Sequence, residues 1–132
     1  YDLSRFIFTG RVEPEELVDV FSISDLHIYL TVPFVLSWSL MNSLSCGCTV
    51  LGSATAPVKE MIKHGETGLL ADFFDVNRLT EKALHALESP QASRELGANA
   101  RALVEARYDQ NVCLSQMEAF FREVAESKSL SS

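Results

Sequence analysis

Short apolar runs alternate with amphipathic segments along the first half of the chain. The apolar runs predict strands over Arg5–Thr9, Leu26–Leu30, Thr49–Gly52 and Leu69–Ala71. Between them, apolar side chains recur at helical spacing, and this predicts helices that begin at Pro14, Trp38 and Pro57. Strand–helix alternation of this kind is typical of a parallel sheet with helices on both faces.

From Asp75 onward the spacing of apolar residues is helical. Asp75, Ser89 and Asp109 stand where three successive helices are expected to begin. Their predicted inward stripes are Val76, Leu79, Ala83 and Leu87; Leu96, Leu103 and Val104; and Cys113, Met117, Phe121 and Val124. We therefore expect an α/β fold, a Rossmann-like doubly wound parallel sheet with a helical C-terminus, over residues 1–126. Residues 127–132 are expected to form a disordered tail.

The stretch Pro33–Ala56 contains no Asp, Glu, Lys or Arg. Ser37 is placed to cap a helix with its hydroxyl, and Gly47 supplies the left-handed residue that ends it. One helix face carries Ser39, Asn42, Ser43 and Cys46, and the other carries Leu40, Met41 and Leu44, which we expect to face a core. A helix N-terminus that follows a strand and a loop can bind an anion. On spacing alone, however, an ordinary packed α/β core is the simpler interpretation.

Composition and charge exclude several classes of protein. With 132 residues, of which 47% are apolar and 22% charged, the chain suits one soluble globular domain. A net charge of −7 without a Lys/Arg cluster argues against nucleic-acid binding. The sequence contains no apolar run of the roughly 18 residues that a membrane span needs, and no signal-peptide pattern. We expect a cytoplasmic protein.

The cysteines and histidines do not form a metal-ligand pattern. Cys46, Cys48 and Cys113 are odd in number and have no CxxC spacing, so we expect reduced core thiols. The three histidines, His27, His64 and His85, fall in different predicted elements. We predict neither a metal site nor a cofactor.

Three blocks in the expected order and spacing resemble family 4 (group 1) glycosyltransferases. Leu40, Leu44, Gly47 and Val50 match the end of the donor-binding signature, which reads roughly E-G-F-G-L-P-x-x-E-A-M-A-x-G-x-P-V. Ala56–Ile62 and His64–Leu70 look like the G-x-P-E-x-I and D-G-x-T-G-L-L segments of that family. The resemblance covers about residues 5–90. It implies the C-terminal, donor-binding domain of a GT-B enzyme, with its N-terminal strands missing.

The resemblance also implies an activity and a site. Such an enzyme is a retaining, hexosyltransferase-type transferase that moves a sugar from a nucleotide diphosphate sugar to an acceptor without a catalytic metal. By this comparison, backbone groups of Gly10, Arg11 and Val12 would meet the base, and those of Ser37, Trp38 and Ser39 would meet the diphosphate. Arg11 is equally interpreted as a solvated loop charge. We expect Trp38 to be a core aromatic rather than a stacking platform for the base.

Two departures from the family pattern affect this site. The two glutamates of the family, eight positions apart, fall on Phe34 and Asn42, so no catalytic residue is assigned. Phe34 cannot make the hydrogen bonds of the first carboxylate, so it either packs as an apolar wall of the donor site or shows that this subgroup holds the sugar differently. The Asn42 amide can hydrogen-bond the ribose or lack a ligand altogether. A degenerate, non-catalytic GT-B-like binding or assembly module is the alternative function. A receiver-like domain is a third, but Asp25 and Asp72 do not provide its acidic cluster.

The family also has an N-terminal, acceptor-binding domain and an upstream Arg/Lys pair, and neither has a counterpart in this sequence. We therefore expect a fragment that is inactive alone. Its expected partners are the nucleotide sugar and the missing N-terminal GT-B domain. The family's strand order, 3-2-1-4-5-6, would leave Leu26–Leu30 with an open edge. Arg5–Thr9 can close in beside Leu26–Leu30 within one chain, or two chains can pair these edges or exchange the first strand–helix unit. We expect self-association through this region, most simply as a dimer.

Overall fold

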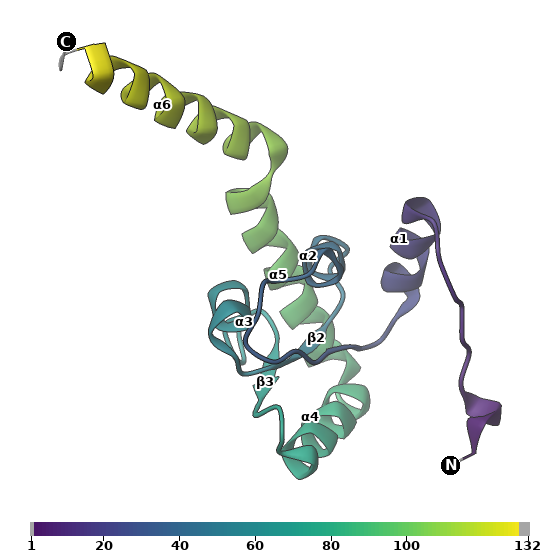
Figure 1. Ribbon diagram of the computed structural model, residues 1–132. Coiled ribbons are helices and arrows are strands. Elements are labelled where there is room, and N and C mark those ends of the chain that lie inside the picture. Colours follow the sequence, from purple (N-terminus) through teal and green to yellow (C-terminus); the bar gives the residue numbers. More distant parts are fainter. Residues whose placement is uncertain (1, 130–132) are drawn as a thin grey trace.

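A parallel, three-stranded sheet forms the centre of the protein. The computed structural model describes residues 2–129. The strands are β1 (His27–Tyr29), β2 (Val50–Ser53) and β3 (Leu69–Ala71), in the order β1-β2-β3 (Figure 1). Ile28 pairs with Leu51, and Gly52 pairs with Leu70. Three of the four predicted strands and the α/β, Rossmann-like class are thereby confirmed.

Helices, joined by loops, make up the rest of the described chain. After a short 3-10 helix, η1 (Leu3–Arg5), come α1 (Pro14–Ile23), α2 (Trp38–Ser45), α3 (Ala56–Met61), α4 (Val76–Glu88), α5 (Pro90–Tyr108) and α6 (Gln110–Ser129). The predicted caps of α4 and α6 are confirmed, because Asp75 and Asp109 each accept a hydrogen bond of 2.9 Å from a backbone amide of the helix that follows. Residues 127–129 of the predicted tail belong to α6; residues 130–132 lie outside the described residues.

The two faces of the sheet carry different helices. The register puts Tyr29, Val50 and Leu70 on the face that packs against α2, α3 and α5. Ile28 and Leu51 point to the opposite face, beside α4. Leu40 and Leu44 of α2 are fully buried, as predicted, and Met41 is partly buried. Burial of one such leucine contributes about 1.5–3 kcal/mol.

Helix α5 lies against the turn that joins α2 to β2. Gly47 in this turn has φ +71, which ends α2 as predicted. A Cβ atom added to Gly97 of α5 would collide with the carbonyl oxygen of Gly47. Nearby, the Thr49 hydroxyl donates to the Ser93 carbonyl at 2.6 Å. Helix α5 is thus held against the start of β2 by direct backbone approach and by a buried hydrogen bond.

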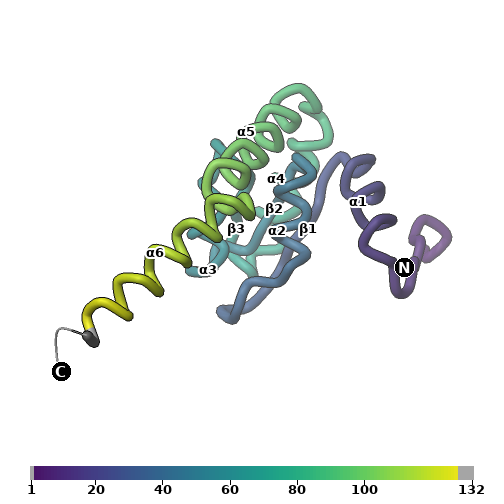
Figure 2. Tube along the Cα trace, turned by 90° about the horizontal axis from the view of Figure 1, so that it is seen from above, coloured from purple at the N-terminus to yellow at the C-terminus, as the bar shows by residue number. Residues whose placement is uncertain are grey.

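The predicted strand Arg5–Thr9 is wrong. Its first residue closes η1, which Asp2 caps by accepting from the Ser4 amide at 3.0 Å. Residues 6–9 are extended but unpaired, and they lie on the far side of α1 from the sheet (Figures 1 and 2). Aromatic and β-branched residues favour a strand only where a neighbouring strand takes up their backbone groups. This segment has no such neighbour.

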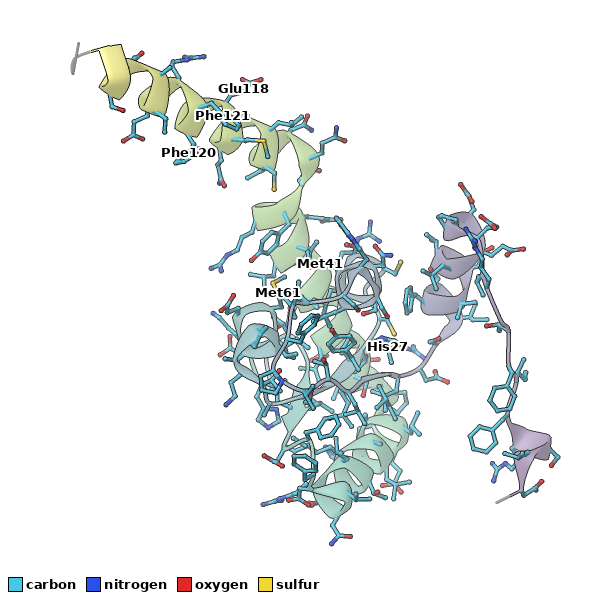
Figure 3. The ribbon with its side chains drawn as sticks, viewed as in Figure 1. His27, Met41, Met61, Glu118, Phe120 and Phe121 are labelled. Carbon is cyan, nitrogen blue, oxygen red and sulfur yellow. The ribbon has the colours of Figure 1, made fainter. Side chains whose placement is uncertain are left out.

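Several predicted inward stripes remain exposed. Among the residues expected to be buried, Val76, Leu87, Met117, Phe121 and Val124 are exposed. Helix α6 extends away from the sheet, and Figure 3 shows Phe120 and Phe121 on that extension. The amphipathic spacing predicted these helices correctly. It could not establish which helix faces are covered, because that depends on what packs against them.

Candidate functional site

The loops that follow the three strands lie at one edge of the sheet, because the strands are parallel. Two of these loops are joined by a reciprocal pair of hydrogen bonds. The Thr31 amide donates to the Ser53 hydroxyl at 3.0 Å, and this hydroxyl donates to the Thr31 carbonyl at 2.7 Å. Ser53 is fully buried. The loops after β1 and β2 are therefore fixed relative to each other at this edge.

A tyrosine of β1 holds the start of α2 at the same edge. The backbone amide of Ser37 donates to the Tyr29 phenol oxygen at 3.1 Å, and Tyr29 is buried. Ser37 is the N-cap residue of α2, as predicted, but its hydroxyl makes no capping bond. That part of the prediction is wrong. Tyr29 positions the backbone here in place of a side-chain cap, and the Ser37 side chain stays exposed.

Three donors at the start of α2 are unpaired within residues 2–129: the Ser37 hydroxyl and the amides of Trp38 and Ser39. The first amides of a helix have no partner inside the helix. Together with the helix dipole they give this end a partial positive charge. The arrangement is suited to an anionic group such as a phosphate.

Two exposed aromatic residues lie in the loop before α2 and at its first position. Trp38, the first residue of α2, is 82% exposed, so the expectation that it is a core aromatic is wrong. Phe34, in the loop before α2, is also exposed. Trp38 precedes Leu40 by two residues, which is about 200° around the helix, so it lies on the side of α2 opposite the buried face. Phe34 and Trp38 thus add apolar surface beside the free amides, and their roles in binding remain predictions.

His27 lies beneath the same helix. Its Nε2 is 3.4 Å from the Ser39 hydroxyl, and its ring meets Phe21 of α1 edge-on, with 5.0 Å between ring centroids (Figure 3). Burial lowers the pKa of His27 below its ordinary value of 6.5. The imidazole is therefore neutral at pH 7. No local pattern of residues predicts this contact, because His27 and Ser39 lie in different elements.

We expect His27 to make stability fall on acidification. Its folded-state pKa is the lower one, so its contribution is fully present above about pH 6.5 and is lost as the pH falls through the folded pKa. Urea unfolding of the natural chain and of His27→Gln from about pH 7.5 to 5.5 should show the steeper loss in the natural chain. His64, present in both proteins, cancels from the difference. Parallel pH profiles would contradict this role of His27.

Asn42 lies about one turn beyond the donors, on a different side of α2. It is exposed and lines a cavity of about 220 Å³ with Pro14, Leu17, Val18 and Phe21 of α1 and with Ser45 and Cys46. The cavity lies between α1 and α2. Asn42 is therefore directed toward α1, and a contact from Asn42 to a ribose stays a prediction.

Gly10, Arg11 and Val12 are not brought to the start of α2. They lie beyond α1 with the rest of the N-terminal segment (Figures 1 and 2). Gly10 has φ +66, and Arg11 Nε lies 4.0 Å from Glu13 Oε1. Of the residues predicted for donor binding, the structure groups Phe34, Ser37, Trp38 and Ser39. The base contacts predicted for residues 10–12 remain predictions.

A larger cavity, of about 490 Å³, lies at the opposite edge of the sheet. Asp25, Cys46, Cys48, Arg94 and Arg101 are among the residues that line it. Burial raises the pKa of the Cys48 thiol above its ordinary value of 9.0, so this thiol is protonated and a poor nucleophile. Ligands of parallel α/β sheets bind beyond the carboxyl ends of the strands. We therefore place the candidate site at the start of α2.

Across residues 2–129, no set of three or more His, Cys, Asp or Glu side chains is arranged to hold a metal ion. No helix in the same range has both the length and the apolar character that crossing a bilayer would require.

Comparisons with known proteins agree on one family. The family model described as "Glycosyl transferases group 1" matches residues 3–103. The N-acetyl-alpha-D-glucosaminyl L-malate synthase of Bacillus anthracis is 25% identical over 120 residues, which cover 91% of this chain and 31% of that protein. This chain therefore spans about a third of the length of that relative.

Two solved structures of other proteins are also similar to this chain. Sucrose-phosphate synthase from Thermosynechococcus elongatus matches with a TM-score of 0.81 and 26% identity, over 92% of this chain and 30% of that one. The Anabaena protein Alr3699/HepE in complex with UDP-glucose matches with a TM-score of 0.76 and 18% identity, over 82% of this chain and 30% of that one. The latter similarity bears on the fold alone.

Proposed function

We propose that this chain, which belongs to the group 1 glycosyl transferases, is the donor-binding part of a retaining, family 4 glycosyltransferase. The complete protein would transfer a hexosyl unit from a nucleotide diphosphate sugar to an acceptor. The chain spans 31% of its Bacillus anthracis relative. We accordingly assign transfer to the complete protein and only donor binding to these 132 residues.

The observation that carries the proposal is the group of unpaired donors at the start of α2. A diphosphate is anionic in the bound donor and gains charge as it leaves the sugar. The Ser37 hydroxyl and the amides of Trp38 and Ser39 can donate to its oxygens. Because Tyr29 fixes this helix end, the donors need no rearrangement as charge develops. This role needs backbone N–H groups, so it does not depend on the two absent glutamates.

Other observations support the same substrate class. UDP-glucose is bound to the Anabaena protein, whose fold this chain shares. The exposed rings of Phe34 and Trp38 could cover the apolar faces of a base or sugar. We propose that the nucleotide sugar is a substrate rather than a cofactor, and that no metal takes part. The three cysteines are free, which suits the reducing cytoplasm.

A non-catalytic binding module is the second candidate. Phe34 and Asn42 stand in place of the two glutamates of the family signature, and neither can supply a charge-assisted hydrogen bond to a sugar hydroxyl. Such a module would keep the diphosphate site and lose transfer. Both candidates therefore predict nucleotide binding, and they differ in the turnover of the complete protein.

We expect UDP, GDP or ADP to quench the fluorescence of Trp38, the single tryptophan, with a dissociation constant in the millimolar range. We expect weak binding because these 132 residues contain neither the Arg/Lys pair nor the two signature glutamates of the family. Red-edge excitation limits absorption by the nucleotide, and titration of N-acetyltryptophanamide corrects for the remainder. Uridine serves as the control without phosphate. If none of the three diphosphates gives a saturable change beyond this correction, the donor site is contradicted.

A further inference from the structure

The cavity of about 490 Å³ lies where β1 and β2 begin, at the edge of the sheet opposite the proposed donor site. Its walls come from four parts of the chain: the loop from α1 to β1, the turn from α2 to β2, the end of α4 and one side of α5. Helix α2, with 8 residues and a length of about 12 Å, separates the cavity from the free amides at the start of that helix. Pockets that hold small molecules have volumes of about 300–1,000 Å³, so this cavity has the size of a ligand site.

Hydrogen bonds between distant residues hold these walls together. The Thr49 hydroxyl, just before β2, donates to the Ser93 carbonyl of α5 at 2.6 Å, and the Ser93 hydroxyl donates to the Ala86 carbonyl of α4 at 2.7 Å. The Cys48 thiol donates to the Ser24 carbonyl at 3.7 Å, which joins the α2–β2 turn to the α1–β1 loop. The fold itself therefore forms the cavity, and a ligand does not have to order its walls on binding.

Charged side chains of opposite sign line this cavity and do not pair with each other. Arg94 and Arg101 lie on the same side of α5, since seven residues make almost two helical turns, or about 10.5 Å along the axis. Asp25 belongs to the wall formed by the α1–β1 loop. Within residues 2–129, neither Arg94 nor Asp25 forms an ion pair, and Arg101 uses its Nε for Glu105 at 2.8 Å. The cavity thus has cationic donors on one wall and a carboxylate on another.

We propose that this cavity is a second ligand site and that it binds an acidic sugar, meaning a small sugar that carries a phosphate or a carboxylate. Arg94 and Arg101 would donate to the oxygens of the acidic group, because the planar guanidinium matches both acids. Asp25 would accept from sugar hydroxyls, and the Ser22 and Ser24 residues of the same wall add groups that both donate and accept. A simple anion would use only the arginines and would be repelled by Asp25. Three hydrogen-bonding residues on one wall match several hydroxyls better than the single ammonium of an amino acid.

Protection of Cys46 from alkylation tests this proposal on the 132-residue chain. Cys46 is half-buried and lines the cavity, whereas Cys113, also half-buried, lies outside it on α6. Ribose 5-phosphate and glucuronate are the probes, and mass spectrometry follows the reaction of each cysteine with iodoacetamide. The better of the two probes should slow the alkylation of Cys46 with a half-maximal effect at about 1 mM. The rate at Cys113 should stay unchanged. The more effective probe identifies the acid as phosphate or carboxylate.

Three smaller probes separate the parts of the ligand, at equal ionic strength. Ribose has hydroxyls without an acid, inorganic phosphate has an acid without a sugar, and β-alanine has an acid and an ammonium without hydroxyls. Each should need at least about ten times the concentration of the better acidic sugar, because each leaves one wall of the cavity without its partner.

Arg94→Gln should raise the half-maximal concentration of the better acidic sugar at least about fivefold. Arg107→Gln is the matched control, because it removes the same charge from an exposed position of α5 that does not line the cavity. It should behave like the natural chain. Asp25→Asn should weaken protection by the acidic sugar and strengthen protection by inorganic phosphate, since it loses a charged acceptor and a repelling charge at once. Arg94, Arg107 and Asp25 are all exposed, so circular dichroism should stay unchanged.

Absence of protection at Cys46 by both acidic sugars would overturn the proposal, as would equal protection of Cys46 and Cys113. A smaller probe that acts as well as the acidic sugars would also overturn it, because one wall would then suffice. So would equal losses in Arg94→Gln and Arg107→Gln. Each of these results is independent of whether UDP binds at the start of α2.

Discussion

Replacing Gly97 by alanine should lower the free energy of unfolding by about 3 kcal/mol. The new Cβ would occupy the place of the Gly47 carbonyl oxygen, which belongs to the backbone and cannot rotate away. Helix α5 would have to withdraw from the turn between α2 and β2. This withdrawal would strain the buried hydrogen bond from Thr49 to Ser93 and loosen the contacts of Val104 with the core.

The expected loss of stability in Gly97→Ala is opposite in direction to the effect of helix propensity. Alanine is the better helix former, by about 1 kcal/mol, and without the collision Gly97→Ala would stabilise α5. Ala102→Gly, at an exposed position of the same helix, is the matched control and should cost about 1 kcal/mol. Urea unfolding at a constant m-value gives both numbers. A Gly97→Ala protein as stable as the natural one would contradict the close approach of α5.

Replacing Ser39 by aspartate should weaken UDP binding at least about tenfold while leaving the fold slightly more stable. Ser39 is the second residue of α2, and its free amide is one of the proposed diphosphate donors. A carboxylate there interacts favourably with the helix dipole, by about 0.5 kcal/mol. It also repels the phosphates and competes for the same N–H groups. A general loss of structure would lower both the free energy of unfolding and the affinity for UDP. A lower affinity in a protein that is slightly more stable would therefore show that Ser39 lies at the phosphate site.

Ser39→Asn is the matched control, because it keeps a polar side chain of similar size without the charge. It should bind UDP close to the natural level in the Trp38 fluorescence titration. Neutral asparagine also retains a hydrogen-bonding partner for His27. Equal affinity of the aspartate and asparagine variants would show that no phosphate lies at the start of α2.

Local signals in the sequence predicted most of the elements. Prolines and capping acids mark where α1, α4 and α6 begin, and Gly47 marks the end of α2, because each acts on backbone groups within a few residues. Short apolar runs located β1, β2 and β3. The segment Arg5–Thr9 carries the same local signal and is not a strand. A strand requires a partner that no local pattern specifies.

The candidate site was predictable in part. The family resemblance predicted that Ser37, Trp38 and Ser39 would meet the diphosphate, and the structure places all three at the start of α2. The residues that fix this end, Tyr29 and the Thr31–Ser53 pair, could not be predicted. Their hydrogen bonds join positions far apart in the sequence. Trp38 is exposed although we expected a core aromatic: helical spacing places it about 200° around α2 from Leu40, and only its apolar character suggested burial.

The most direct test of the donor site is an amide-resolved NMR titration of the ¹⁵N-labelled chain with UDP. We expect saturable shifts at the amides of Trp38 and Ser39, next to the Ser37 amide that is hydrogen-bonded to Tyr29, at millimolar nucleotide. The same amides should stay unshifted with uridine. Shifts confined to other regions, such as the cavity beside Arg94 and Arg101, or no saturable shift at all, would contradict nucleotide binding at the start of α2.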